Sequence, residues 1–179
     1  MAKYVAFLRA INVGGHVIKM ETLAGLFNEL KFKNVKTFIQ SGNVIFETAG
    51  NDAAAISNKI EKKLEKSLGY EVKTILKDTA ELNNIIKANP FKDYKLDKDT
   101  KNYIAFLSIK PGKEVNTILD LFNTGNDSFI LNKTEIYCLV HKDEKNSSYF
   151  SILNLEKKLG IPLTTRNITT INKINSLLQ

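Results

Sequence analysis

The stretch "FIQSGNVIF", residues 38–46, has the pattern of a β-hairpin, with two apolar runs joined by the polar turn Ser41-Gly42-Asn43. Serine, glycine and asparagine are the residues that short turns prefer. A second stretch, "FILNKTEIY" at residues 129–137, has the same apolar frame around a different polar tip. Because the frame recurs and only the tip changes, the chain contains a similar hairpin twice.

Three further pairs of segments repeat in the same order. "KYVAFLRAI" from residue 3 matches "NYIAFLSIK" from residue 102, "LAGLFNE" from 23 matches "ILDLFNT" from 118, and "EKSLGYEVKT" from 65 matches "EKKLGIPLTT" from 156. The offset between the copies falls from 99 to 95 to 91 residues, as expected if the second copy has shorter loops. Ordered self-similarity of this kind indicates an internal duplication.

Each copy follows the same order of secondary structure. For the first copy the sequence predicts strands at residues 3–10, 35–40, 44–48 and 71–76, and helices that begin near residues 20, 52 and 79. The helices are indicated by apolar residues at helical spacing, such as Ile56, Ile60 and Leu64. Gly69 has the position of a C-terminal helix cap.

The order β-α-β-β-α-β is that of a ferredoxin-like unit, in which the first and third strands are neighbours in an antiparallel sheet and helices cover one face. We therefore expect the α+β class, with tandem ferredoxin-like units at residues 1–90 and 101–179 joined by a linker at 91–100. The second unit includes a C-terminal helix. Both faces of the strand at 3–10 are apolar, so the helix-free face also needs a cover, most simply the other copy.

The composition favours a cytoplasmic protein with no membrane association. A single cysteine, Cys138, excludes an internal disulfide, and its apolar surroundings in "EIYCLV" predict a buried structural thiol. The apolar run before Arg9 is too short for a signal peptide, and no stretch approaches membrane-spanning length. The net charge of +7 comes from lysines scattered among 19 acidic residues, which is typical of a solvated surface rather than a polyanion-binding face.

The predicted topology brings polar residues together at one edge of the first sheet. The loop "RAINVGGH" follows the first strand and should lie beside the hairpin tip "QSGN". It leads to the N-terminus of the first helix, whose unpaired N–H groups favour an anion. The candidate ligand-binding residues at this edge are Arg9, Asn12, Gly14, Gly15, Lys19, Gln40, Ser41, Gly42 and Asn43. The alternative is an ordinary glycine loop beside an ordinary turn.

All but two of the 26 basic residues are lysines, which draws attention to Arg9 and Arg166. The planar fork of arginine makes bidentate contacts that lysine cannot imitate. At an offset of 91, Arg166 matches the apolar Ile75, so we expect the second unit to place this guanidinium near the first unit's candidate edge. The alternative is a brace between the units, with no ligand.

"YVAFLRAINVGGH", "TFIQSGNVIF", "NPF" at 89–91 and "TTRN" at 164–167 together resemble domain-of-unknown-function family 1697 over the full length of the chain. The resemblance implies a pair of ferredoxin-like units and no established activity. It differs from the family pattern at Ile168, where a tryptophan is usual. The family's recurring positions correspond to Arg9, Asn12, Gly14, Gly15, Lys19, Met20, Gln40, Ser41, Gly42, Asn43, Arg166 and Asn167.

Three functions are compatible with these features, and a purely structural or interaction role is the remaining possibility. Binding of a small anionic or nucleotide-like ligand at the Arg9/Gly14-Gly15/Ser41–Asn43 edge is the first, although no established phosphate-loop motif is present. RNA or other nucleic-acid binding is the second and less favoured. The third is an enzyme of unknown reaction in which His16 activates Ser41, for which no acidic partner is obvious. Catalysis, cofactor and oligomeric state stay open, and one cysteine and two histidines make a metal site improbable.

Overall fold

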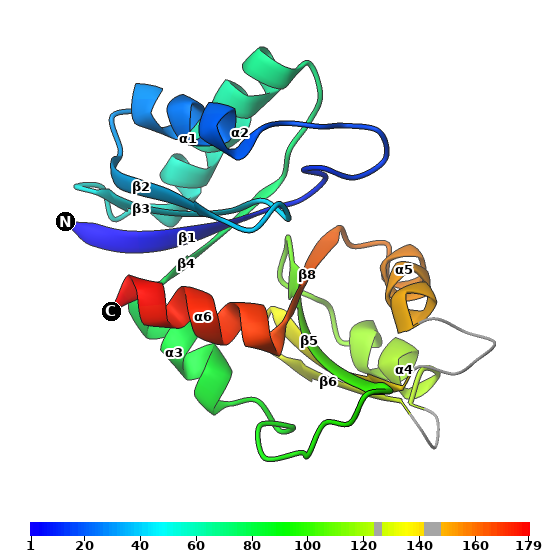
Figure 1. The fold of residues 1–179 in the computed structure, drawn as a ribbon. Coiled ribbons are helices and arrows are strands. Elements are labelled where there is room, and N and C mark those ends of the chain that lie inside the picture. The colour runs from blue at the N-terminus through cyan, green and yellow to red at the C-terminus, as the bar shows by residue number, and fades with distance from the viewer. Residues whose placement is uncertain (124–126, 142–147) are drawn as a thin grey trace. The chain divides into compact units, whose positions relative to one another are not determined.

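The computed structural model describes residues 1–123, 127–141 and 148–179 (Figure 1). The first copy contains β1 (Ala2–Leu8), α1 (Met20–Glu29), β2 (Lys33–Phe38), β3 (Asn43–Thr48), α2 (Ala53–Leu68), β4 (Thr74–Asp78) and α3 (Thr79–Lys87). The second contains β5 (Thr100–Leu107), α4 (Glu114–Asp120), β6 (Ser128–Asn132), β7 (Glu135–His141), α5 (Ser148–Leu159), β8 (Leu163–Asn167) and α6 (Ile168–Leu178).

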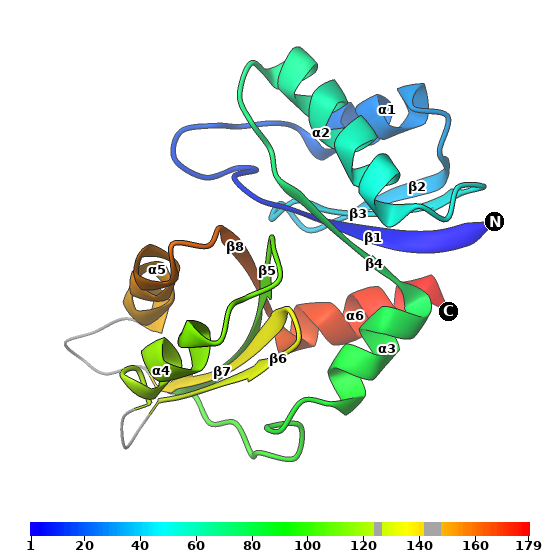
Figure 2. The same cartoon turned by 180° about the vertical axis from the view of Figure 1, so that it is seen from behind.

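The described strands form two four-stranded antiparallel sheets, with the orders β2-β3-β1-β4 and β6-β7-β5-β8. The first and third strands of each copy are neighbours, so the predicted pair of tandem ferredoxin-like α+β units is confirmed. Helices α1 and α2 lie over one face of the first sheet, and α4 and α5 over one face of the second (Figures 1 and 2).

The helical spacing of apolar residues produces the core of the first unit. Phe27 of α1 and Ile60 and Leu64 of α2 are fully buried against the sheet, where they join Tyr4 and Phe46 in one cluster. Asp52 caps the start of α2 and Gly69 caps its end, as predicted. Asp52 accepts a hydrogen bond from the Ala55 N–H at 3.0 Å, and Gly69 adopts the left-handed conformation with φ +81°.

Among the described side chains, the second unit repeats this packing with fewer aromatic residues. Leu119 of α4 and Leu155 of α5 pack with Ile136, Cys138 and Val140 of β7. Cys138 is fully buried, and burial raises the pKa of its thiol far above the usual value. The prediction of a buried structural thiol is therefore confirmed.

The helix-free face of each sheet is also buried, as the apolar alternation of the central strands predicts. Phe7 and Ile45 are buried in the first unit, and Phe106 and Leu139 in the second. In the second unit a helix contributes to this cover, because the Tyr137 hydroxyl donates to the Ile85 carbonyl of α3 at 2.9 Å. Helix α3 belongs to the first copy by sequence, so this part of the cover of the second sheet comes from the other copy, as expected.

The boundaries of the compact units differ from those of the predicted segments. The first unit comprises residues 1–83 and 173–179, and the second residues 84–172, so both divisions fall inside helices α3 and α6. Two side-chain hydrogen bonds agree with this division. The Asn175 amide at the end of α6 donates to Asn83 Oδ1 at 2.9 Å within the first unit, whereas Tyr137 holds the end of α3 within the second.

The two hairpins differ in length, which the sequence alignment at a constant offset did not show. The last strand pair before the turn is Phe38 with Asn43 in the first hairpin and Asn132 with Glu135 in the second. The first hairpin therefore has a four-residue turn, residues 39–42, and the second a two-residue turn. Ile39 opens the longer turn with a left-handed φ of +51°, which ends β2 two residues earlier than predicted.

Two other strand ends also differ from prediction. β1 stops at Leu8 rather than at residue 10, since Ala10 and Asn12 adopt left-handed φ values of +64° and +55° that an extended strand excludes. β4 begins at Thr74 rather than at residue 71. No helix in the described ranges is long and apolar enough to cross a membrane.

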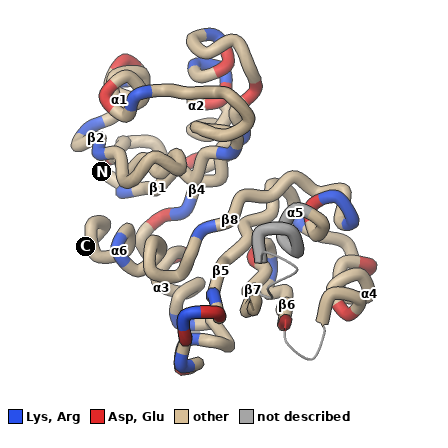
Figure 3. The backbone as a smooth tube through the Cα atoms, turned by 45° about the vertical axis from the view of Figure 1, so that its right-hand side comes forward, with Lys and Arg blue, Asp and Glu red and all other residues tan. Residues whose placement is uncertain are grey.

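Basic and acidic positions are intermixed along both units (Figure 3). The residues that give the net charge of +7 are therefore distributed along the backbone of both units among acidic residues. This arrangement agrees with the interpretation of the lysines as a solvated coat, which provides little long-range steering of a polyanion.

Alkaline unfolding should report on Tyr137. Burial, with a smaller contribution from Glu135, raises the pKa of Tyr137 from 10.0 to about 12. Between these values the unfolded chain has lost the phenolic proton while the folded chain retains it. Stability therefore falls as the pH rises from about 10, by up to about 1.4 kcal/mol per pH unit.

The Tyr137→Phe variant should show a flatter decline across pH 10–12 in urea titrations, after a loss of about 1 kcal/mol at neutral pH from the missing hydrogen bond. Tyr103→Phe removes a half-buried hydroxyl from β5 of the same sheet and serves as the control. Parallel declines in the wild type and Tyr137→Phe would contradict the assignment.

Candidate functional site

The loop after β1 lies against the hairpin turn, as the sequence predicts. The Leu8 N–H donates to the Gly42 carbonyl at 2.8 Å, and the Asn12 side-chain amide donates to the Gln40 carbonyl at 2.9 Å. Both contacts lie within the first unit. The structure thus brings together the two polar segments that were predicted to meet at the same end of the β1–β3 pair.

Asn12 holds this loop in place through hydrogen bonds from both the nitrogen and the oxygen of its side-chain amide. Its Nδ2 holds the turn through Gln40, and its Oδ1 accepts a hydrogen bond from the Ile18 N–H at 2.7 Å, two residues before α1 begins. Asparagine adopts the left-handed conformation found here more easily than most residues. One side chain therefore sets the spacing between the hairpin turn and the start of α1.

Gly42 occupies a position where no side chain fits. A Cβ atom there would lie 2.9 Å from Ile11 Cβ and 3.1 Å from Leu8 Cβ, and φ is +73°. Gly14 and Gly15 also have positive φ, but a Cβ on either would meet nothing within 4 Å. The first glycine permits close packing of turn and loop, whereas the other two leave open space above the backbone.

The turn uses part of the predicted polar set for its own structure. Asn43 is the first residue of β3 rather than a tip residue, and it is fully buried. Its amide donates to the Phe38 carbonyl at 2.9 Å and to Ser41 Oγ at 3.0 Å. Gln40 and Ser41 are the turn residues that present polar side chains to solvent.

Two cations flank the clamped loop. Arg9 is half-buried, and its backbone N–H donates to the Lys73 carbonyl at 2.9 Å. Lys19 is exposed and occupies the N-cap position of α1, where it makes no side-chain capping hydrogen bond. The helix therefore starts without the serine, threonine or aspartate oxygen that usually satisfies its first N–H groups.

The segment before β4 adds a third side to this edge that sequence reasoning missed. The Tyr70 ring stacks on His16, with ring centroids 3.8 Å apart. Lys73 pairs with Glu71 at 2.8 Å and Glu61 at 3.5 Å, and its pKa is raised chiefly by the hydrogen bond to Glu71. The topology could have predicted this contact, because the fourth strand of this fold lies beside the first and the segment before it therefore approaches the loop after β1.

The same edge exposes apolar side chains that were not predicted. Val17 is 87% exposed, Val13 also lies largely in solvent, and Ile39 is 49% exposed. Ile39 is β-branched and left-handed, a conformation that costs about 1–2 kcal/mol. The sequence feature that could have predicted this exposure is the pair of valines on either side of the paired glycines in "NVGGHV", residues 12–17.

Ser41 and His16, the suggested nucleophile and base, have structural contacts. Ser41 Oγ accepts the Asn43 amide, and the His16 ring lies on Tyr70. Within the described ranges no group of three or more histidine, cysteine or acidic side chains is arranged to hold a metal ion.

Arg166 lies in β8 of the second unit and is buried. Its Nη1 donates to Thr164 Oγ1 at 2.7 Å and to the Thr165 carbonyl at 2.8 Å, and burial lowers its pKa to about 10. Asn167 accepts the Thr169 N–H at 2.8 Å and so begins α6. These contacts stabilise the second unit, and the predicted role of Arg166 at the first unit's edge stays a prediction.

The strand register gives Arg166 a different counterpart in the first unit from the one that the sequence predicts. Arg166 pairs with Ile104 of β5, and Lys77 pairs with Val5 at the equivalent position of β1. The structural counterpart of Arg166 is therefore Lys77, a second cation, and not the apolar Ile75. The alignment offset of 91 suggested that a charged residue replaces a core residue at this position. The strand pairing shows instead that both copies have a cation there.

Comparison with known proteins places the chain in a family. The family model described as "Protein of unknown function (DUF1697)" matches residues 1–137. The chain belongs to this family. The description names no activity, and no curated protein matches the sequence.

Two solved structures are similar to different degrees. The conserved bacterial protein SP0830 from Streptococcus pneumoniae aligns over 99% of both chains with a TM-score of 0.75 and 20% identity, which supports the fold. The small subunit of acetolactate synthase from Thermotoga maritima aligns over 93% of this chain and 97% of its own, at 15% identity. Its TM-score of 0.24 is too low to indicate a shared fold.

Gly42→Ala tests the close approach of turn and loop. The substitution combines left-handed strain with a steric clash, and we expect it to lower the free energy of unfolding by about 2–4 kcal/mol. Gly69→Ala is the matched control, since φ is similar but a Cβ would meet nothing within 4 Å. Urea denaturation should show the smaller loss for Gly69→Ala, and equal losses would contradict the clash.

Proposed function

We propose that the edge formed by Arg9, Asn12, Gly14, Gly15, Lys19, Gln40 and Ser41 binds a small anionic, nucleotide-like ligand in the cytoplasm. Gly42 and Asn43 shape this edge from within. The observation that supports the proposal most is the Asn12 clamp, which holds a glycine loop and the start of α1 at a fixed distance from the hairpin turn.

An anion suits the start of α1. The first N–H groups of a helix are partly positive, and Lys19 leaves them without a side-chain cap. Gly14 and Gly15 have open space where a side chain would stand, so a ligand can approach the loop backbone. Glu21 in the first turn opposes an anion, and Lys19 offsets it.

The cations are placed by the same hydrogen bonds that shape the loop. Arg9 follows Leu8, which bonds the turn, and Lys19 follows Ile18, which bonds Asn12. A guanidinium and an ammonium on fixed backbone are partners for phosphate or carboxylate oxygens. Because the loop is already held by Asn12, binding needs to order less of the chain.

The apolar part of the edge favours an organic anion over a bare inorganic one. Val13, Val17 and Ile39 are exposed beside the polar residues. Ligand sites usually combine apolar surface with a few convergent polar groups. A nucleotide offers a charged phosphate and a flat, largely apolar base, and so meets both kinds of surface.

Nucleic-acid stacking has less support from the burial pattern. Ferredoxin-like RNA-binding sheets display aromatic side chains on their central strands. Here Tyr4, Phe7 and Phe46 on β1 and β3 are buried. The central strands of the first sheet, as described, thus offer no exposed aromatic ring to a base.

Calorimetric titration with AMP, ATP and inorganic phosphate tests the proposal. We expect a nucleotide to bind more tightly than phosphate, and Arg9→Ala to weaken nucleotide binding at least tenfold, since a hydrogen bond to a charged group contributes roughly 1.5–3 kcal/mol. Lys19→Ala should weaken it as well. Lys62→Ala, on the exposed face of α2, is the control and should bind as the wild type does.

Absence of binding, or equal losses for Arg9→Ala and Lys62→Ala, would reject the site. Filter binding with single-stranded RNA separates the remaining alternative. RNA affinity that falls steeply with salt but survives Arg9→Ala would assign function to the lysine coat instead.

A further inference from the structure

A small pocket lies in the second unit, where the chain leaves α3 and enters β5. Its cavity volume is about 110 Å³, and its walls include Ile86 of α3, Phe91 and Ile168 at the start of α6. An engineered cavity of about 150 Å³ holds benzene, whereas sites for drug-sized ligands measure roughly 300–1,000 Å³. The pocket is therefore of the size of a single ring.

Two buried amides give this pocket a polar base. Asn89 and Asn102 both line it and are each 2% exposed. Asn89 Oδ1 accepts the Phe91 N–H at 2.9 Å, which is the ordinary length of such a hydrogen bond. The other two bonds are long: Asn89 Nδ2 to Asn102 Oδ1 at 3.5 Å, and Asn102 Nδ2 to the Phe91 carbonyl at 3.3 Å.

These amides retain hydrogen-bonding capacity. Each NH2 group carries two donor hydrogens and each amide oxygen accepts two bonds, so the pair has more donors and acceptors than the three bonds use. Each nitrogen and oxygen of the two amides has one partner, and the second hydrogen of each NH2 group and the second acceptor position of each oxygen suit a planar molecule with its own adjacent acceptor and donor. A single asparagine amide recognises a nucleobase edge through one donor and one acceptor, which is the same hydrogen-bond chemistry.

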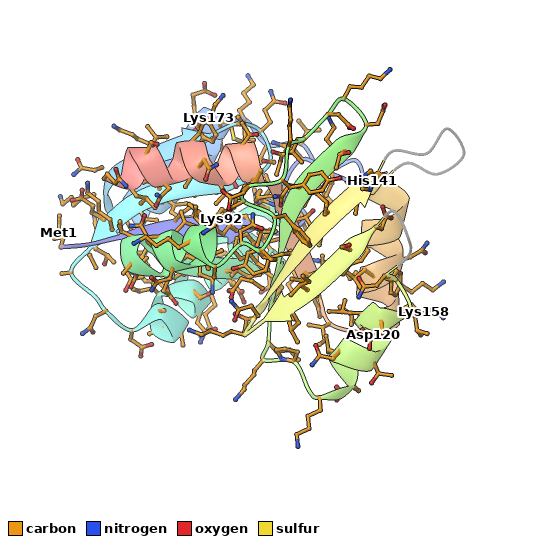
Figure 4. All side chains as sticks on the ribbon, turned by 90° about the horizontal axis from the view of Figure 1, so that it is seen from below. Met1, Lys92, Asp120, His141, Lys158 and Lys173 are labelled. Atoms are coloured by element: carbon orange, nitrogen blue, oxygen red, sulfur yellow. The ribbon has the colours of Figure 1, made fainter. Side chains whose placement is uncertain are left out.

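The remaining lining residues suit a ring. Tyr94 and Leu96 line the pocket and remain 46% and 40% exposed, so apolar and aromatic surface continues from the pocket toward solvent. Lys92, labelled in Figure 4, is exposed and lines the pocket on the same segment. Apolar walls favour the faces of a flat ring, while the amide base favours its polar edge.

The geometry points to a second ligand site in this pocket, for a small planar ring that carries an amide or lactam edge, such as a pyrimidine base or a nicotinamide-like carboxamide. The site lies wholly in the second unit and does not rest on the anion proposal. The Asn89–Asn102 pair hydrogen-bonds the amide edge, and Phe91 and Ile168 contact the ring.

Titration of the full-length protein with uracil and with nicotinamide, followed by ¹H–¹⁵N spectra, tests this site. We expect saturable shifts of the Asn89 and Asn102 side-chain NH2 resonances with at least one probe. Toluene, an apolar ring of similar size, should cause much smaller shifts of these resonances. Backbone resonances of the Arg9–Lys19 loop should not move, which separates this site from the anion site.

Ile168→Phe fills the pocket and should raise the Kd for the probe at least tenfold. Ile109→Phe is the matched control, because Ile109 is 59% exposed and does not line the pocket. If Ile168→Phe lacks a dispersed, folded spectrum, Ile86→Phe fills the same space from α3. No saturable shift with either probe, equal shifts with toluene, or unchanged affinity in the filled variant would each overturn the proposal.

Discussion

The first unit depends on the absence of a side chain at residue 42. Gly42 packs against the Cβ atoms of Leu8 and Ile11, and its carbonyl accepts the Leu8 N–H. This contact fixes where the chain turns after β1. Asn12 then reaches the Gln40 carbonyl on one side and the Ile18 N–H on the other, so the start of α1 follows from the same contact. A larger residue at position 42 would separate the turn from the loop.

Comparison of the two copies shows what distinguishes the candidate edge. Leu107 donates to the Thr134 carbonyl at 2.9 Å, as Leu8 donates to Gly42, so the basic contact is shared. The first hairpin has two more turn residues than the second, and the carbonyl that Asn12 binds belongs to one residue of this longer turn. The extra length therefore supplies the partner for Asn12. Duplication provided the sheet, and the longer turn provided the edge.

Sequence patterns predicted the fold because duplication and periodicity are local signals repeated many times. They also predicted that the loop after β1 would meet the hairpin turn, since pairing of β1 with β3 requires it. They could not locate left-handed residues such as Ala10 and Ile39, because no side-chain preference marks these conformations. Likewise, the sequence matched Arg166 with Ile75 because a constant offset carries no information on strand register. The register is set by backbone pairing, which matches Arg166 with Lys77.

The division of the chain inside α3 and α6 has the same origin. Sequence composition marks residues 91–100 as a linker because they are polar and charged, but compactness depends on which side chains meet. The end of α3 groups with the second unit, where Tyr137 donates to the Ile85 carbonyl, and the end of α6 groups with the first unit, where Asn175 donates to Asn83. Neither partner is near in sequence, so neither contact has a local signature.

Most of the side-chain polarity at the candidate edge is already used to build it. Asn12 bonds two backbone groups, Asn43 is buried, and Ser41 accepts a bond from Asn43. Recognition of a ligand therefore has to come from the open glycine backbone, the uncapped start of α1, the two cations Arg9 and Lys19, and exposed apolar surface. Basic and acidic residues alternate along the chain, and charges in solvent are screened beyond about 10 Å, so attraction of an anion depends on these short-range contacts rather than on the net charge. Selectivity at such an edge depends on the shape of the loop and on the positions of its cations. The hydrogen bonds of Asn12 set both before a ligand binds.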